Sequence, residues 1–262
     1  NIPDELPRVI LSLPPAENRD IFWEEKARDI FVEAGFSEVW NYSFLRKDAA
    51  GAFGFKAECS DFKDEQLVEL ENPLDQNRPY LAPSLLPNLL NNIVLNSPNF
   101  ETIKIFELGK VFFRSADQEI SEERRLAAAL WSNSRQGFWD LKGGLEFLFE
   151  KMGIKDWEWN SGKEAGTLFL TLFEISVGRE KLGFLGELRP DLAPAPSAQN
   201  HLYFSEINFE KLLARASERK TYTPLTKNPS AKRDLSLLVP LKTKVSAVKK
   251  KIESRKVSYL IK

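Results

Sequence analysis

The apolar residues of this chain follow two different periods, which alternate without a regular order. Helical spacing, in which one face carries the apolar side chains, marks residues 19–34, 85–94, 140–152, 209–216 and 245–254. Strand-like alternation or short apolar runs mark residues 39–45, 67–70, 103–113, 124–131, 167–177, 181–188, 202–207, 234–239 and 257–261. A doubly wound α/β protein would alternate strand and helix in turn. The order found here favours the α+β class with mostly antiparallel strands.

The predicted helix boundaries rest on residues with special backbone or capping chemistry. Gly35 follows the first helical stretch, at the position of a left-handed cap residue. Ser84 is the predicted N-cap of the next helix, and Pro87 is tolerated in its first turn. Asp140 is predicted to open a third helix, which ends at Gly153.

The predicted strands carry two features that the structure can test. Trp40, Tyr42 and Phe44 are expected to share one face of the first strand, because alternate residues point to the same side. The apolar run that contains Leu108-Gly109 is interpreted as a strand pair broken at those two residues. Gly178-Arg179 is the predicted turn of a hairpin.

Length and composition indicate one large domain and a small one. With 262 residues, 42% of them hydrophobic, the chain has enough apolar material for a sizeable core. A polar stretch with two prolines at residues 222–229 marks a boundary. We therefore expect a lead-in segment at residues 1–18, a core at 19–221 and a small C-terminal part at 222–262.

The chain shows no sign of membrane insertion or secretion. No apolar run approaches the ~20 residues of a membrane helix, and the N-terminus lacks the pattern of a signal peptide. Cys59 is the single cysteine, so no intrachain disulfide is available, which fits a reducing cytosol. A cytoplasmic location without a membrane partner is expected.

Few residues have the chemistry of a catalytic or metal site. One cysteine and one histidine exclude the usual zinc motifs. His201 precedes an apolar strand, and we interpret it as a structural or surface residue rather than a catalytic base. The glycines of the hairpin region lack phosphate-loop spacing and are assigned to turns and close packing: Gly178, Gly183 and Gly186.

Charge gives little indication of a nucleic-acid partner. The 37 Lys and Arg residues nearly balance 38 Asp and Glu residues, so any RNA contact needs a local patch. Glu146 and Glu150 can share a helix face, which we interpret as solvated rather than catalytic. The one basic cluster either meets an RNA backbone or forms a solvated face: Lys227, Lys232, Arg233, Lys242, Lys244 and Lys249–Lys251.

Several short motifs follow one another in a fixed order along most of the chain: Glu33–Val39 with Asn41–Phe44, Glu71–Leu74 with Ser84–Leu90, Phe106–Phe112, Asp140–Gly143, Gly183–Pro190 and Asn228–Leu237. In this order they resemble the β subunit of bacterial phenylalanyl-tRNA synthetase. Departures from the family are Leu81-Ala82-Pro83, where Met-Arg-Thr is common, a short stretch at residues 131–140, and a C-terminal domain cut to about its first third.

The resemblance implies a class II synthetase-like antiparallel sheet flanked by helices, followed by the beginning of a ferredoxin-like anticodon-binding domain. In this family the α subunit uses ATP and Mg²⁺ to charge tRNA(Phe) with phenylalanine, in an α2β2 heterotetramer. The β core is not the catalytic copy and editing belongs to upstream domains. We therefore expect no catalytic, cofactor or metal residue in this chain. Lys232 and Arg233 are the candidate RNA contacts.

One position supports the non-catalytic interpretation directly. Class II enzymes carry Phe-Arg-x-Glu on a strand, and the Arg grips the α-phosphate of ATP. If Phe106-Glu107 marks the equivalent strand, Ile105 stands where the Arg belongs. Lys104 is no substitute, because neighbouring strand residues face opposite sides.

Alternative functions stay open on the residues alone. An active class II-like ligase with an unusual ATP site would catalyse pyrophosphate exchange without a partner. A free-standing RNA-binding module would bind tRNA with a steep salt dependence. The apolar helix faces at residues 85–94 and 141–152 would either pack internally or meet the α subunit.

Overall fold

The computed structural model describes residues 18–46, 67–115, 117, 119–162, 168–191, 200–218, 234–241, 243 and 245–254. The chain divides into two compact units, Asn1–Lys220 and Thr221–Lys262. Within the described residues, no helix is both long and apolar enough to span a bilayer.

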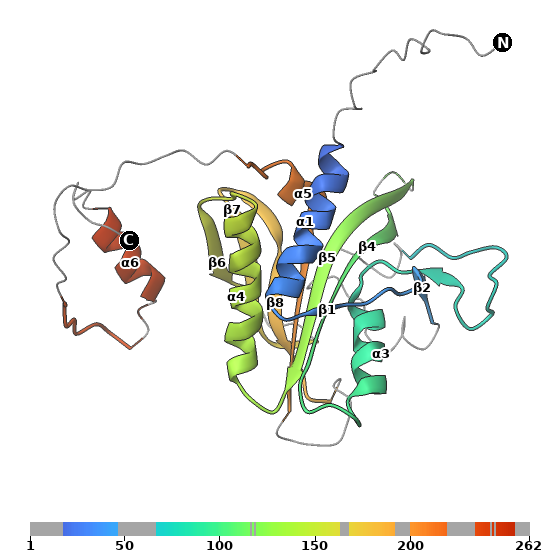
Figure 1. Cartoon of the computed structure of the whole chain (residues 1–262), viewed down its shortest axis with the longest axis horizontal. Helices are drawn as coiled ribbons and strands as arrows, with labels where there is room; N and C mark the ends of the chain where they lie inside the picture. Colours follow the sequence, from blue (N-terminus) through green and yellow to red (C-terminus); the bar gives the residue numbers. More distant parts are fainter. Residues whose placement is uncertain are drawn as a thin grey trace, which may run out of the picture. The chain divides into compact units, whose positions relative to one another are not determined.

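The first unit is built on a seven-stranded sheet in the order β1-β4-β5-β9-β8-β7-β6 (Figure 1). Its strands are β1 (Ser37–Glu38), β4 (Ile103–Arg114), β5 (Ile120–Ser132), β6 (Trp157–Ser161), β7 (Phe169–Val177), β8 (Glu180–Leu188) and β9 (His201–Asn208). β1 runs parallel to β4, and every other neighbouring pair is antiparallel. β2 (Phe44–Leu45) and β3 (Tyr80–Leu81) form a separate two-stranded sheet. The expected α+β fold with a predominantly antiparallel sheet is therefore confirmed.

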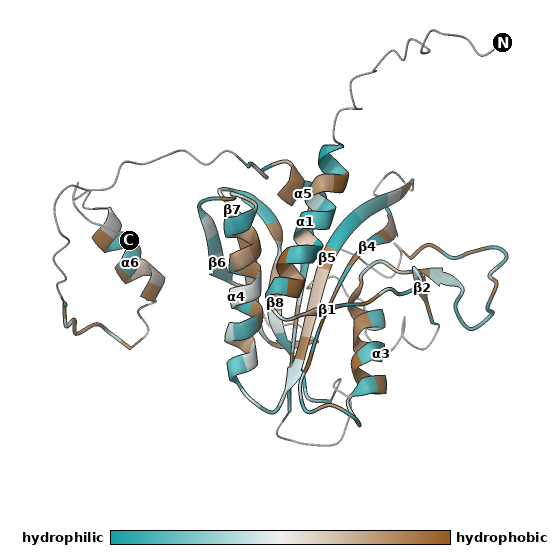
Figure 2. Cartoon of the chain, viewed as in Figure 1, coloured by the Kyte–Doolittle hydropathy of each residue, from teal (hydrophilic) through white to brown (hydrophobic). Residues whose placement is uncertain are grey.

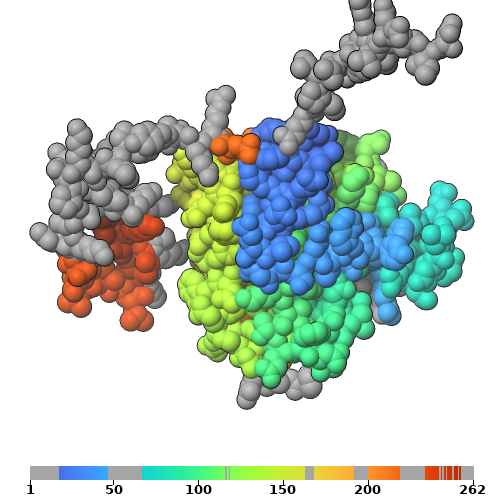
Figure 3. Space-filling view, in the orientation of Figure 1, coloured from blue at the N-terminus to red at the C-terminus, as the bar shows by residue number. Residues whose placement is uncertain are grey.

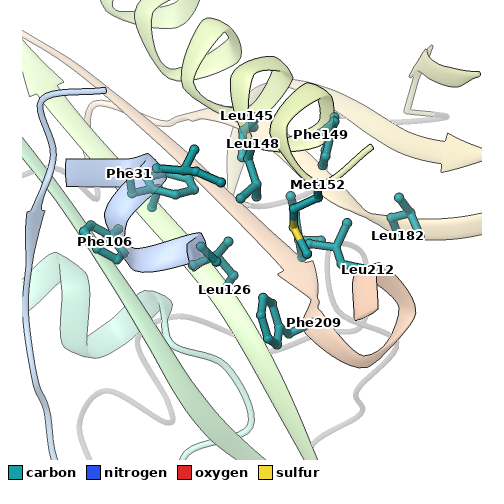
Figure 4. Close-up of a cluster of buried hydrophobic side chains, with 14 of the residues drawn as sticks. Phe31, Phe106, Leu126, Leu145, Leu148, Phe149, Met152, Leu182, Phe209 and Leu212 are labelled. Carbon is teal, nitrogen blue, oxygen red and sulfur yellow. The ribbon is translucent and has the colours of Figure 1, made fainter. Parts of the chain in front are cut away.

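Helices cover both faces of the large sheet. The helices α1 (Arg19–Glu33), α4 (Gln136–Lys151) and α5 (Phe209–Leu213) pack on one face, and α3 (Leu86–Asn96) packs on the other. Figure 4 shows the cluster under α1 and α4, where Phe31 stacks on Phe106 with ring centroids 5.0 Å apart. In Figure 3, α1 and α4 lie side by side on the visible surface.

The helices form and end largely where the sequence predicts. The side chain of Asn18 caps α1, since its Oδ1 accepts from the Asp20 N–H at 3.0 Å. Gly35 has φ +84° and Gly153 has φ +71°, which confirms both as left-handed caps. α4 begins at Gln136 rather than at Asp140, so that prediction is four residues late. Figure 2 shows α3 and α4 with apolar and polar sides.

The predicted break at Leu108-Gly109 is wrong, because β4 runs through both residues and pairs with β5 without interruption. A Cβ on Gly109 would lie 3.0 Å from Cδ2 of Leu85. The glycine therefore lets the segment before α3 pack closely on β4, which is a packing requirement rather than a turn.

The first predicted strand is also partly wrong. Of residues 39–45, only Phe44–Leu45 forms a strand, β2, and β1 ends just before the predicted run; Trp40 is 80% exposed and Tyr42 is 75% exposed. Beyond β1 the chain leaves the sheet. There the Asn41 N–H donates to the carboxylate of Glu107 at 3.0 Å instead of to the carbonyl of a neighbouring strand. Similarly, the run at residues 67–70 makes a single bridge, from Glu69 to Tyr80.

Other elements follow the pattern more closely. The hairpin of β7 and β8 turns at Gly178, which has φ +62°, as predicted. α5 ends at Leu213 instead of residue 216, and the strand at Trp157–Ser161 was not predicted.

In the second unit, α6 (Val245–Glu253) confirms the helix expected at residues 245–254. Residues 234–239 form no strand, and within the described part of this unit no other strand is there to pair with them. The strand predicted at residues 257–261 lies outside the described residues.

Candidate functional site

A group of charged and amide side chains interrupts the apolar face beneath α3. Strand register places Glu107 opposite Ala127, which in turn lies opposite Glu206. In the adjacent row, Arg125 lies between Gly109 and Asn208. Ala127 belongs to the apolar cluster packed against α3, and strand residues alternate between the two faces. These polar groups therefore share the α3 face of the sheet.

Glu206 is the most deeply buried of them, with 2% of its surface exposed. Its carboxylate accepts hydrogen bonds from Ser84 Oγ at 2.6 Å and from the Leu85 N–H at 3.2 Å. Ser84 Oγ in turn accepts from the Leu86 N–H at 3.2 Å, but the N-cap position of α3 is Leu85, one residue later than predicted. The carboxylate lies at the positive end of α3 and fixes that end to β9.

Glu107 has a parallel role on β4. It accepts from the Asn41 N–H at 3.0 Å and from Asn41 Nδ2 at 2.9 Å. Asn92 of α3 donates to Asn41 Oδ1 at 3.1 Å. The side chain therefore ties the segment between β1 and β2, and through it α3, to the sheet.

Burial raises the pKa of both carboxyl groups above its usual range. For Glu206, the Arg125 guanidinium and the bonds from Ser84 and Leu85 oppose the rise in pKa. For Glu107, the hydrogen bonds from Asn41 oppose it, while the charge of Glu206 adds to it. Both carboxylates accept hydrogen bonds from other residues of the chain, so we interpret this network as structural rather than as a ligand site.

The position expected to carry an ATP-binding Arg is buried among apolar side chains. Ile105 is 7% exposed and belongs to the apolar cluster packed against α3. Lys104 points to the other face, where its Nζ pairs with Asp140 of α4 at 2.9 Å. Lys104 and Ile105 therefore face opposite sides of the sheet, as predicted from the alternation of strand residues.

A second frame for the Phe-Arg motif was missed in the sequence. Phe113-Arg114 ends β4, at the far end of the strand from Ile105. Ser115 and Ala116 follow, so this frame has the Arg but lacks the Glu of Phe-Arg-x-Glu. The dipeptide itself was the signal that would have found it.

His201 lies in a pocket on the opposite face, between α4 and β7–β9. Its Nδ1 is 2.6 Å from Glu187 Oε1, and its ring stacks on Tyr203 with centroids 6.0 Å apart. Burial raises the pKa of Tyr203 to about 12. The pocket has a volume of about 550 Å³ and is also lined by Arg135 and Trp139.

The remaining candidates have structural explanations or lie outside the described residues. Glu146 accepts from Trp159 Nε1 at 3.0 Å and pairs with Lys142, so it is not a free catalytic acid. A Cβ on Gly183 would lie 2.2 Å from the Glu206 carbonyl oxygen, which confirms close packing there. Three sets lie outside the described residues: Lys232 and Arg233, Lys227 with Lys242 and Lys244, and Cys59. Among the residues described, no three His, Cys, Asp or Glu side chains form a metal site.

The fold defines the class of protein. Two solved structures of pyrrolysyl-tRNA synthetase from Desulfitobacterium hafniense superpose on 74% of this chain, with TM-scores of 0.60 and 0.57. They cover 67% and 68% of those chains at 19% and 18% sequence identity. The first unit therefore has the fold of a class II aminoacyl-tRNA synthetase.

Sequence comparison identifies the family within that class. The family described as "Phenylalanyl tRNA synthetase beta chain CLM domain" matches residues 2–209, and the chain belongs to it. The phenylalanine–tRNA ligase β subunit of Moorella thermoacetica is 31% identical over 241 residues, and that of Fusobacterium nucleatum is 30% identical over 254. These alignments cover 86% and 91% of this chain, but only 29% and 31% of the relatives.

Proposed function

We propose that this chain is the catalytically silent core of a phenylalanine–tRNA ligase β subunit. It serves as a scaffold for assembly with the catalytic α subunit and for placement of tRNA(Phe). The observation that carries the proposal is the burial of Ile105, which on our interpretation of the motif order stands where the ATP-gripping Arg is expected.

The surroundings of Ile105 support a packing role. α3 covers this face of the sheet with Leu86, Leu89 and Ile93, all buried. An aliphatic side chain cannot stabilise the negative charge that accumulates on a transferring phosphoryl group. The nearby carboxylates would repel a phosphate, and Glu206 is already used to hold α3. The face that binds ATP in an active class II enzyme thus serves here to hold elements together.

The proposal extends to the partners of the whole enzyme. ATP and Mg²⁺ would bind the α subunit, within a cytoplasmic α2β2 heterotetramer. Residues 222–262 would begin a ferredoxin-like anticodon-binding domain, with Lys232 and Arg233 as its RNA contacts. Support comes from the family membership of residues 2–209 and from the Asn228–Leu237 motif.

The test is to mix the chain with the α subunit from the same source and to measure the mass of the eluting species by light scattering after size exclusion. A stable complex that contains both chains is the expected result. If the chain is folded by circular dichroism yet elutes alone at its own mass of 30.0 kDa, the scaffold proposal is wrong for this part of the subunit.

A further inference from the structure

The pocket beside His201 has features that the scaffold role does not use. It lies on the α4 face of the sheet, whereas the buried Glu206 lies on the α3 face. Its volume of about 550 Å³ falls within the roughly 300–1,000 Å³ typical of small-molecule sites. Both aromatic and charged side chains line it, which is the composition expected of a site for a ligand that has a flat ring and a charged group.

The aromatic part of the lining is fixed on one side and open on the other. The Phe138 ring packs on Phe173 and Tyr203, with centroids 5.5 and 5.9 Å away. Tyr203 is 2% exposed, so this wall belongs to the core and cannot move far. Trp139, by contrast, is 60% exposed. A flat ring entering the pocket would gain contact with an indole that otherwise faces solvent.

The charged part of the lining favours an anion next to that ring. Arg135 precedes α4 and makes no ion pair or side-chain hydrogen bond with the residues that the structure describes. It stands at the positive end of a 16-residue helix, which adds to the local positive potential.

Two further polar groups are held in place. The contact between His201 Nδ1 and Glu187 Oε1 orients both side chains. Asn200, which also lines the pocket, has an amide that can both donate and accept. Polar groups of this kind suit the edge of a heterocyclic base better than an aliphatic chain.

We propose that this pocket binds a nucleotide. The base stacks on Trp139, the phosphate meets Arg135 and the N-terminal end of α4, and the base edge faces the His201–Glu187 pair. The nucleotide is either a free mononucleotide or an unpaired residue of an RNA strand, since both present the same base and phosphate. The site does not depend on assembly with an α subunit, so its failure would leave the scaffold proposal standing.

Calorimetric titration of the full 262-residue chain tests the proposal with three probes: AMP, a short single-stranded oligoadenylate RNA, and inorganic phosphate. Arg135→Ala and Trp139→Ala are the test variants. Arg179→Ala and Trp40→Ala are matched controls, because both residues are exposed and neither lines the pocket. Thermal unfolding of every variant checks that the fold is intact.

The expected result is binding of AMP or of the RNA that each test variant weakens by about tenfold or more and that the controls leave unchanged. Binding of both probes identifies the shared nucleotide chemistry, and binding of the RNA alone identifies a strand as the source. Phosphate should bind far more weakly than either. Absence of binding of both nucleotide probes, or binding equally affected by Trp40→Ala and Trp139→Ala, would overturn the proposal.

Discussion

At the scale of single residues, the buried carboxyl group of Glu206 combines two opposing effects. It supplies the acceptor that the Ser84 hydroxyl and the Leu85 N–H need at the start of α3. Burial also raises its pKa, because water no longer solvates the charge. The hydrogen-bonding role and the charge are separable by substitution.

Glu206→Gln should change how stability depends on pH. An acid with a raised pKa binds its proton more tightly when folded, so it lowers stability as pH rises from 4.5, its ordinary pKa, through the raised value. Glutamine keeps an acceptor oxygen and loses the charge. We expect the stability of the variant relative to the wild type, measured by urea unfolding, to increase as the pH rises above 4.5.

A constant difference between the two proteins across that range would contradict this account. Glu206→Leu is the matched control for the hydrogen bonds. It leaves the donors of Ser84 and Leu85 buried without an acceptor, which should cost about 1–3 kcal/mol relative to Glu206→Gln at every pH.

Two glycines offer a second test at this scale. Gly183→Ala would place a Cβ 2.2 Å from the Glu206 carbonyl oxygen and 2.8 Å from Cα of Ile207. Backbone atoms cannot retreat as a side chain can, so we expect a loss of about 1–3 kcal/mol or more in the free energy of unfolding.

Gly143→Ala is the control, since its Cβ would meet nothing within 4 Å on an exposed position of α4. It should stabilise the chain by about 0.5–1 kcal/mol, because alanine favours the helix. Equal effects of the two substitutions in urea unfolding would show that the close approach of β8 and β9 is not as described.

At the scale of elements, Arg124 joins two helices to the sheet. Its guanidinium on β5 meets Asp20 at 2.9 Å and Glu24 at 2.7 Å, both on α1, and Glu210 on α5 at 3.0 Å. The Arg124 N–H also donates to Glu210 at 3.0 Å. A single side chain thus sets the positions of α1 and α5 relative to β5.

Arg124→Met should destabilise the first unit by about 1–3 kcal/mol, because Glu24 and Glu210 lose a half-buried partner. The control is Lys110→Met, which removes the exposed pair of Lys110 with Glu122 and should cost less than about 1 kcal/mol. Thermal or urea unfolding of both variants makes the comparison. If the two substitutions cost the same, Arg124 does not have this joining role.

Elements whose signals are local could be predicted from the sequence. Gly35 and Gly178 marked a helix end and a turn because the ability to adopt a positive φ is a property of glycine itself. The departure of the chain from the sheet after Val39 could not be foreseen, since the Asn41 N–H bonds to Glu107, which is 66 residues away from it. For the same reason the Glu206 network was missed: Ser84 and Glu206 are 122 residues apart and meet only in the folded sheet.

At the scale of the whole molecule, the first unit has a class II synthetase fold, and Ile105, which we propose stands at the phosphate-binding position, belongs to the core. The absence of a suitable Arg was predictable from the motif order alone. That Ile105 is buried beneath α3 required the structure. The fold therefore identifies the structural class, whereas the side chains on the α3 face decide whether ATP could bind there.

Amino-acid-dependent exchange of pyrophosphate into ATP, measured with the chain alone in the presence of Mg²⁺ and phenylalanine, tests this central claim most directly. The account predicts no exchange above that of buffer, for the wild type and for Ile105→Ala alike, while the α subunit supplies the activity when it is added. Exchange that rises in proportion to the concentration of the chain alone would show that it is an active ligase and would contradict the account.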